Sequence, residues 1–171
     1  MKILMVCLGN ICRSPYAEKA GQTIFEEAGL SGVRCVSAGL RAKEGVSPPS
    51  EAVDAAARRG RDLSAHRARP TTRELLEDFD LVVAMEASQL EQLRAEHPTH
   101  AVRVVLLPLY VERRGYRRAN IADPFGRPRA AFDACYEEID ECLLALSHAL
   151  ADGERLVRIT GQDAEVSRRL G

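Results

Sequence analysis

Four short apolar runs alternate with helix-like stretches, and this alternation constrains the fold of the chain more than any other feature. The runs are rich in β-branched or aliphatic residues, are bounded by polar residues or glycine, and cover 2–7, 33–38, 81–85 and 102–107. Near-continuous apolar runs are typical of parallel strands that are covered on both faces. The alternation of strands and helices therefore predicts an α/β fold.

Helical periodicity predicts five helices, at 15–28, 50–59, 73–79, 87–96 and 129–151. For the first helix we expect Ser14 as the N-cap and Pro15 at the first helical position. The pair Thr71 and Glu74 has the spacing of a capping box and predicts the start of the third helix.

The length of 171 residues and the mass of 18.8 kDa suit a single domain. A chain of this size buries about 70% of its extended surface on folding, so its core needs no disulfide or metal. We expect the folded domain to cover 1–151. Residues 152–171 are polar and weakly patterned, and we expect them to form a tail of unknown structure.

The formal net charge of −1 argues against a duplex-DNA binder, because such proteins usually carry a basic excess. No apolar run approaches the roughly 18 residues of a membrane span. The apolar run at 3–7 is also too short for the core of a signal peptide. We therefore expect a cytoplasmic protein without nucleic-acid or membrane partners, and its five cysteines should be thiols in that reducing compartment.

The segment after the first run has the composition of an anion-binding loop. Gly9 and Asn10 tolerate positive φ, so the backbone can curl and point successive N–H groups inward. The dipole of the following helix adds to this positive site. The residues expected to surround the anion are Leu8, Gly9, Asn10, Ile11, Cys12, Arg13 and Ser14.

Cys7 and Arg13 stand at the two ends of this loop. A thiol beside N–H donors, a helix N-terminus and a guanidinium is expected to have a depressed pKa. The planar guanidinium of Arg13 can bind two phosphate oxygens at once. The C-x5-R spacing thus supplies what thiolate phosphoryl transfer needs, with Cys7 as the nucleophile and Arg13 as the phosphate-binding cation.

Residues 6–15, VCLGNICRSP, resemble the signature V-C-x-G-N-x-C-R-S-P of the low-molecular-weight protein tyrosine phosphatases. The resemblance extends over about residues 1–150 and includes Ser37-Ala38-Gly39, His66-x-Ala68-Arg69 and Asp123-Pro124. It implies a single-domain, three-layer α/β fold with the phosphate-binding loop after strand 1. It also implies a four-stranded parallel sheet in the order 2-1-3-4, and hydrolysis of phosphomonoesters through a phosphocysteine without a cofactor.

The resemblance implies that Asp123 is the general acid, and later the base that activates water against the phosphocysteine. Protonating the leaving oxygen is worth roughly 10²–10⁴ in rate. Pro124 is expected to stiffen the loop. Ile121 and Phe125 are expected to give an apolar setting that raises the pKa of the Asp123 carboxyl.

Further roles come from the same resemblance. It implies that Asn10 and Ser14 bond to Ser37 and His66, and that Ser14 also bonds to the Cys7 thiolate. It implies a reversible disulfide between Cys7 and Cys12 that protects the nucleophile from over-oxidation. The other three histidines lack the spacing of metal ligands, so no metal is expected.

Substrate choice should depend on the rim of the cradle, for which the candidates are Leu8, Ile11, Leu40, Arg41, Lys43 and Phe125. The bulky Ile11 favours a flat phenol, and Phe125 is the main aromatic residue of the rim. The arginine-phosphatase branch of the family resembles this loop but favours Thr in place of Ile11. The Asp-Pro-Phe-Gly sequence at 123–126 fits that branch as well, so phosphotyrosine is preferred here and phosphoarginine stays the alternative. The basic cluster at 113–118 is a candidate contact for acidic substrates.

Three other functions fit the sequence less well. Arsenate reduction on this loop needs two further cysteines near the end of the third strand, and 80–95 contains none. A phosphocysteine carrier does not need Arg13 and Asp123, and a catalytically dead phosphopeptide-binding module usually lacks the cysteine or the acid. The resemblance therefore implies an enzyme acting on phosphotyrosine proteins, with a bacterial tyrosine kinase as one candidate substrate. We expect a monomer or a weak dimer.

Overall fold

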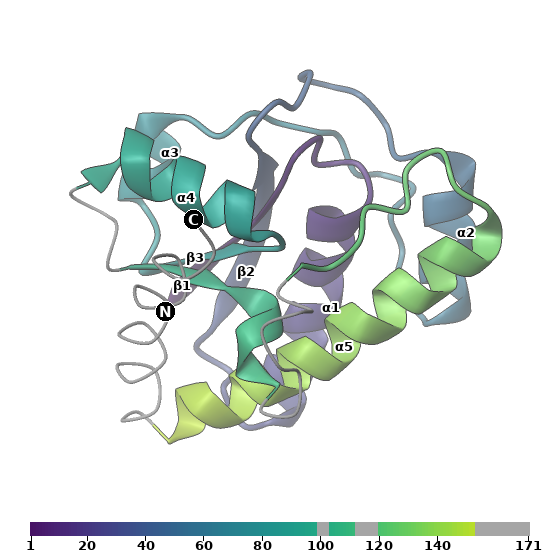
Figure 1. Cartoon of the computed structure of the whole chain (residues 1–171). Helices are drawn as coiled ribbons and strands as arrows, with labels where there is room; N and C mark the ends of the chain where they lie inside the picture. The colour runs from purple at the N-terminus through teal and green to yellow at the C-terminus, as the bar shows by residue number, and fades with distance from the viewer. Residues whose placement is uncertain (99–102, 112–119, 153–171) are drawn as a thin grey trace.

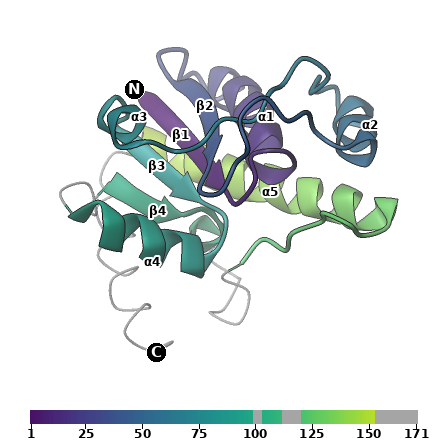
Figure 2. The ribbon, with the colours of Figure 1, turned by 90° about the horizontal axis from the view of Figure 1, so that it is seen from above.

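The computed structural model describes residues 1–98, 103–111 and 120–152. Its sheet contains β1 (Lys2–Cys7), β2 (Arg34–Gly39), β3 (Leu81–Ala84) and β4 (Val104–Leu106). All pairings are parallel, and the strand order is β2-β1-β3-β4 (Figures 1 and 2, with β4 labelled in the second). The predicted fold class and strand order are confirmed.

The central strand β1 brings the ends of its neighbours to the start of the predicted loop. Its register with β2 ends with Cys7 opposite Gly39, and its register with β3 ends with Val6 opposite Ala84. In open parallel sheets, ligands bind at this carboxyl edge. The register therefore places the ends of three strands around one site.

Helices cover both faces of the sheet and make three layers (Figures 1 and 2). One face packs against α1 (Arg13–Glu27), α2 (Ser50–Arg58) and α5 (Arg129–Ala151), and the other against α3 (Arg73–Glu77) and α4 (Ala87–Glu96). Along β1, alternate side chains enter the two cores: Ile3 and Met5 enter the first, and Leu4 and Val6 enter the second.

The first helix begins earlier than the sequence predicted. It starts at Arg13, its N-cap is Cys12, and no side chain caps it. The prediction of Ser14 as N-cap is wrong because the Ser14 hydroxyl is turned toward Cys7 and Asn10, inside the loop. For α3 the cap is Thr72, not Thr71, and its hydroxyl accepts a hydrogen bond from the Leu75 amide at 3.1 Å.

The structure differs from the sequence prediction mainly in the segment that follows β4. A 3-10 helix, η2 (Leu107–Tyr110), follows β4, where the sequence predicted only the end of a strand. The basic cluster at 113–118 and the tail from 153 onward lie outside the described residues. Helix α5 ends at Ala151 as expected, and the boundary of the domain there stays a prediction. Among the described residues, no helix is both long enough and apolar enough to cross a membrane.

Candidate active site

The loop between β1 and α1 curls at one residue. Asn10 has a φ of 53°, in the left-handed region that asparagine tolerates better than most residues. This conformation turns the Asn10 amide toward Cys7, and the N–H donates to Cys7 Sγ at 3.3 Å. Gly9, expected to share this role, does not adopt positive φ. The curl therefore depends on Asn10.

The end of β2 closes against the same loop. The Leu40 amide donates to the carbonyl of Cys7 at 3.0 Å, and the Arg41 amide donates to the carbonyl of Leu8 at 2.8 Å. A Cβ at Gly39 would lie 2.8 Å from both the Asn10 nitrogen and the Leu8 oxygen. These contacts are between backbones that cannot easily shift, so only glycine fits at this position.

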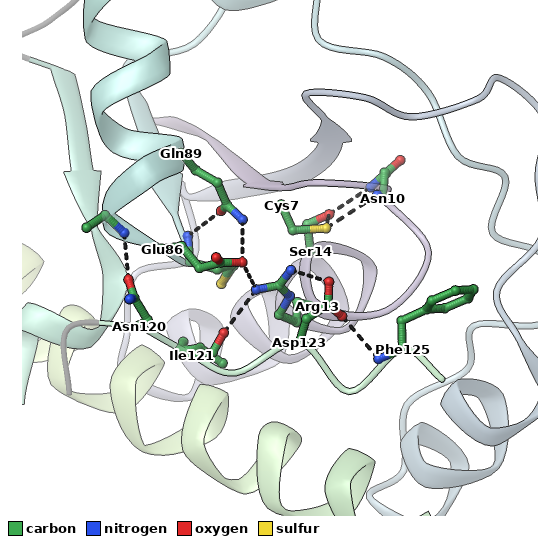
Figure 3. Close-up of polar contacts among 12 residues, drawn as sticks. Cys7, Asn10, Arg13, Ser14, Glu86, Gln89, Asn120, Ile121, Asp123 and Phe125 are labelled. Atoms are coloured by element: carbon green, nitrogen blue, oxygen red, sulfur yellow. Dashed lines mark hydrogen bonds and ion pairs between the residues drawn. The ribbon is translucent and has the colours of Figure 1, made fainter. Parts of the chain in front are cut away.

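Cys7 lies beside the Ser14 hydroxyl, as the family resemblance implied. Ser14 Oγ is 3.0 Å from Cys7 Sγ (Figure 3). It is also 3.2 Å from the carbonyl oxygen of Ala38, so its single proton can be donated to either acceptor. With the Asn10 amide, Ser14 gives a Cys7 thiolate two hydrogen-bond donors. Hydrogen bonds to the charged form of a group stabilise that form.

The Asn10 side chain joins the loop to two other segments. Its amide nitrogen donates to Ser14 Oγ at 2.9 Å and to Ser37 Oγ at 3.0 Å, while its oxygen accepts from the Arg69 amide at 2.9 Å. His66 Nε2 lies 2.9 Å from the Asn10 carbonyl oxygen and must donate to it. The structure thus brings together the four residues that the resemblance placed behind the loop.

Arg13 is almost completely buried, at 1% side-chain exposure, and lies between two carboxylates. Nη1 bonds to Glu86 and to the Ile121 carbonyl oxygen, and Nη2 donates to Asp123 Oδ2 at 2.6 Å (Figure 3). Burial opposes the guanidinium charge, but nearby Cys7, Asp123 and Glu86 outweigh it and raise the pKa of Arg13. The guanidinium is therefore held as a cation in a fixed plane.

Glu86 is a site residue that the sequence analysis missed. Its Oε1 accepts from Arg13 and, at 2.8 Å, from Gln89 Nε2, one turn further along the chain (Figure 3). The available signal was position: an acidic residue two positions after β3 lies at the same sheet edge as Cys7. Only the register of β3 with β1 shows that Glu86 lies next to the active-site loop.

The segment 120–126, which carries Asp123 and is called the acid loop below, is hydrogen-bonded to the turn between β3 and α4. The Ile121 amide donates to the Met85 carbonyl at 2.9 Å. Asn120 Oδ1, labelled in Figure 3, accepts from the Ala87 amide at the start of α4, at 2.7 Å. Asp123 Oδ1 accepts from the Phe125 amide at 3.1 Å, while its other oxygen pairs with Arg13. The carboxylate therefore has polar partners on both oxygens, in contrast to the apolar setting expected from Ile121 and Phe125.

A cavity of about 220 Å³ contains the three groups expected to carry chemistry. Leu8 and Phe125 are 42% and 60% exposed, so apolar surface extends from the cavity into solvent. Leu40 and Lys43 are not among the lining residues, and Leu40 packs against the core on the α3–α4 face. The lining residues are Cys7, Leu8, Gly9, Ile11, Cys12, Arg13, Arg41, Asp123 and Phe125.

Cys12 lines the same cavity as Cys7, and both are free thiols in this structure. Burial, with smaller effects from Asp123 and Cys7, raises the pKa of Cys12 to about 12. Cys12 is therefore a neutral thiol near pH 7, unable to compete as a nucleophile. Its disulfide with Cys7 stays a prediction.

The cavity combines a thiol with two N–H or O–H donors, a fixed guanidinium and a carboxyl group. This set can seat a tetrahedral oxyanion, attack its central atom and exchange a proton with a leaving oxygen. No group of three or more His, Cys, Asp or Glu side chains in the described segments is placed to hold a metal ion.

The chain is similar to one protein family over nearly its whole length. A family model described as "Low molecular weight phosphotyrosine protein phosphatase" matches residues 2–156. The probable low molecular weight protein-tyrosine-phosphatase EpsP of Ralstonia nicotianae is 35% identical over 137 residues, which are 80% of this chain and 87% of EpsP.

Solved structures of phosphatases are similar to this chain over most of its length. The YwlE arginine phosphatase, as a cysteine-to-serine mutant with a phosphorylated active-site serine, has a TM-score of 0.81 and 32% identity, over 91% of this chain and 99% of that one. The tyrosine phosphatase AmsI of Erwinia amylovora has a TM-score of 0.76 and 30% identity, over 86% and 91% of the two chains.

Proposed function

The chain belongs to the low-molecular-weight protein tyrosine phosphatase family, and we propose that it removes phosphate from protein phosphotyrosine through a phosphocysteine on Cys7. It is a phosphoric monoester hydrolase with a single α/β domain. The observation that carries the mechanism is that the Cys7 thiol, the Arg13 guanidinium and the Asp123 carboxyl line one cavity of about 220 Å³.

In the first half-reaction, the phosphoryl group sits in the loop with its oxygens toward the inward N–H groups and Arg13. The Cys7 thiolate forms a bond to phosphorus as the ester oxygen leaves. Asp123 donates a proton to that oxygen, so the product is a neutral phenol. Arg13 now holds Asp123 through Nη2, and a bound phosphoryl oxygen would take over that donor and release the carboxyl group to act as the acid.

In the second half-reaction, a water molecule attacks the phosphocysteine. Asp123, now a carboxylate, takes a proton from this water. The sulfur–phosphorus bond breaks and returns the thiolate, which Ser14 and the Asn10 amide stabilise as the leaving group. The same two donors thus serve both the attack and the departure of sulfur.

The walls of the cavity favour phosphotyrosine. Leu8, Ile11 and Phe125 present apolar surface suited to a flat phenyl ring. Arg41 adds a second cation to the lining besides Arg13, against the single carboxylate of Asp123. A guanidinium leaving group would meet repulsion from Arg41, whereas a phenol would not.

Phosphoarginine is the second candidate, because the YwlE arginine phosphatase has the same fold at a TM-score of 0.81. That likeness concerns the whole chain. The preference for phosphotyrosine rests on the cavity itself, on Ile11 and Arg41 in particular. The two substrates differ in the group that enters between these side chains.

The test is a comparison of kcat/KM on two peptides of equal sequence, one with phosphotyrosine and one with phosphoarginine. We expect phosphotyrosine to be favoured by at least about tenfold, within the range that one pocket provides. Arg41→Gln should lower the ratio of the two kcat/KM values. Arg34→Gln, which changes an exposed arginine on β2, should leave this ratio unchanged. A larger kcat/KM for phosphoarginine would overturn the substrate proposal without affecting the role of Cys7.

We propose a cytoplasmic location and a bacterial tyrosine kinase among the substrates. The named relatives come from bacteria, and a phosphatase of this kind needs a kinase that supplies its substrate. A phosphotyrosine immunoblot of the source cells, with and without this gene, would identify the proteins whose phosphorylation increases in its absence.

A further inference from the structure

A second cavity, called the rear cavity below, lies between α1 and the segment 60–69, next to the residues that support the active-site loop between β1 and α1. Its volume is about 670 Å³, three times that of the candidate active site, and falls in the range of about 300–1,000 Å³ typical of small-molecule pockets. It shares no lining residue with the active-site cavity. The lining residues are Glu18, Lys19, Gln22, Thr23, Gly60, Arg61, Asp62, Ala65, His66, Arg67 and Arg69.

The lining of this rear cavity has an excess of positive charge. Four residues are cationic, namely Lys19, Arg61, Arg67 and Arg69, and two are acidic. Both acidic groups have partners within the protein: Glu18 accepts from Ser37 Oγ at 2.7 Å and pairs with Lys19 Nζ at 3.6 Å, and Asp62 accepts from the Ser64 amide at 2.8 Å. With four cationic side chains against two carboxylates, the net charge of the lining is positive.

Arg61 carries the strongest sign of an unmet need. Its Nε is buried and has no hydrogen-bond partner, and no carboxylate in the described part of the chain lies within ion-pair distance of its guanidinium. A buried donor without a partner costs about 1–3 kcal/mol. An anion bound in the cavity would satisfy this donor and the charge together.

Two residues that line the rear cavity, His66 and Arg69, also bond to Asn10 of the active-site loop. His66 Nε2 donates to the Asn10 carbonyl, and the Arg69 amide donates to Asn10 Oδ1. Arg69 Nε also donates to the Ser37 carbonyl at 2.7 Å. Both His66 and Arg69 line the rear cavity, so a ligand there would contact the support of the catalytic loop.

We propose that the rear cavity binds a small polyanion with phosphate or carboxylate groups, held by Arg61 and Arg67, which have no ion-pair partner among the described residues. The lining residues include no Phe, Tyr or Trp, so a large apolar ring of the kind that holds a nucleobase is missing among them. The four cations line one cavity, and this grouping favours a compact ligand with several negative charges. This binding is independent of the proposed phosphatase reaction.

Isothermal titration calorimetry with inorganic pyrophosphate tests the proposal on the full chain. Because the active-site loop can also accept an anion, the informative quantity is the difference between variants. Arg61→Gln should remove one binding site or weaken it by about tenfold, as expected for the loss of one charged hydrogen bond. Arg67→Gln should also weaken binding. Because Arg67 is exposed, this variant is expected to fold normally, so it tests the proposal even if Arg61→Gln misfolds.

Arg34→Gln, with the same loss of charge on exposed β2, is the matched control and should titrate like the wild type. Three results would overturn the proposal: isotherms of Arg61→Gln and Arg67→Gln that match the control, equal weakening in all three variants, or no binding to the wild type. Loss of turnover in an active-site variant would leave all of these results unchanged, so the two proposals fail separately.

Discussion

At the scale of single residues, Arg13 organises the candidate active site. It is buried, and it bonds to the carboxylate of Glu86 just before α4, to the carboxylate of Asp123 and to the backbone carbonyl of Ile121. The sequence predicted its role from the C-x5-R spacing. It could not predict Glu86, because the contact depends on the register of β3 with β1, across 73 residues of chain.

Asp123→Asn tests the acid. We expect kcat/KM on phenyl phosphate to fall by roughly 10²–10⁴, because an amide cannot protonate the leaving oxygen. Phosphates of strongly acidic phenols should lose far less, because their leaving groups depart unprotonated. The measurement is kcat/KM across a series of aryl phosphates, since this constant covers only the steps through phosphocysteine formation. Asp54→Asn, exposed on α2, is the control, and equal losses across the series would remove Asp123 as the acid.

His66 gives a prediction about pH. Burial lowers the pKa of His66 below its ordinary value of 6.5, although the hydrogen bond to the Asn10 carbonyl opposes this. The unfolded chain then binds a proton more readily than the folded one, so the contribution of His66 to stability is lost as pH falls through 6.5 toward the folded pKa.

We therefore expect chemical denaturation at a series of pH values to show a smaller loss of stability on acidification in His66→Gln than in the wild type. His148→Gln, at an exposed position on α5, should keep the wild-type dependence. A pH dependence that is equal in wild type and His66→Gln would show that this histidine does not titrate as its burial requires.

At the scale of elements, the active-site loop is shaped by the end of β2 as much as by its own residues. The sequence pattern gave the strands and helices to within a few residues, because apolar periodicity is a local property. It misplaced both helix caps it named. Ser14 is used inside the site, and which of two adjacent threonines caps α3 depends on where the helix starts.

Gly39→Ala tests this packing. The added Cβ would lie 2.8 Å from two backbone atoms of the loop, and overpacking of this kind costs about 1–3 kcal/mol. We expect a lower free energy of unfolding by denaturant and a lower kcat/KM, because the loop must shift. Gly32→Ala is the matched control, since a Cβ there meets nothing within 4 Å. A Gly39→Ala protein with the stability and activity of this control would contradict the account of the loop.

At the scale of the whole molecule, the three-layer fold was predictable and the arrangement of the site was partly so. Alternating strands and helices gave the α/β class, and the resemblance gave the strand order. The loop from Cys7 to Ser14 is continuous in sequence, so its chemistry could be inferred directly. Contacts of the acid loop and the rear cavity join segments far apart in the chain, and only the folded structure brings them together.

The central claim is that the phosphoryl group passes through Cys7. The most direct test is to quench the reaction with p-nitrophenyl phosphate in acid within the first turnover and to locate phosphate by mass spectrometry. We predict a burst of p-nitrophenol and a phosphate adduct on Cys7. Cys7 and Cys12 lie in the same tryptic peptide, so the Cys12→Ser variant, which should keep the adduct, distinguishes the two thiols. Phosphate on another residue, or turnover with no burst and no protein-bound phosphate, would contradict the account.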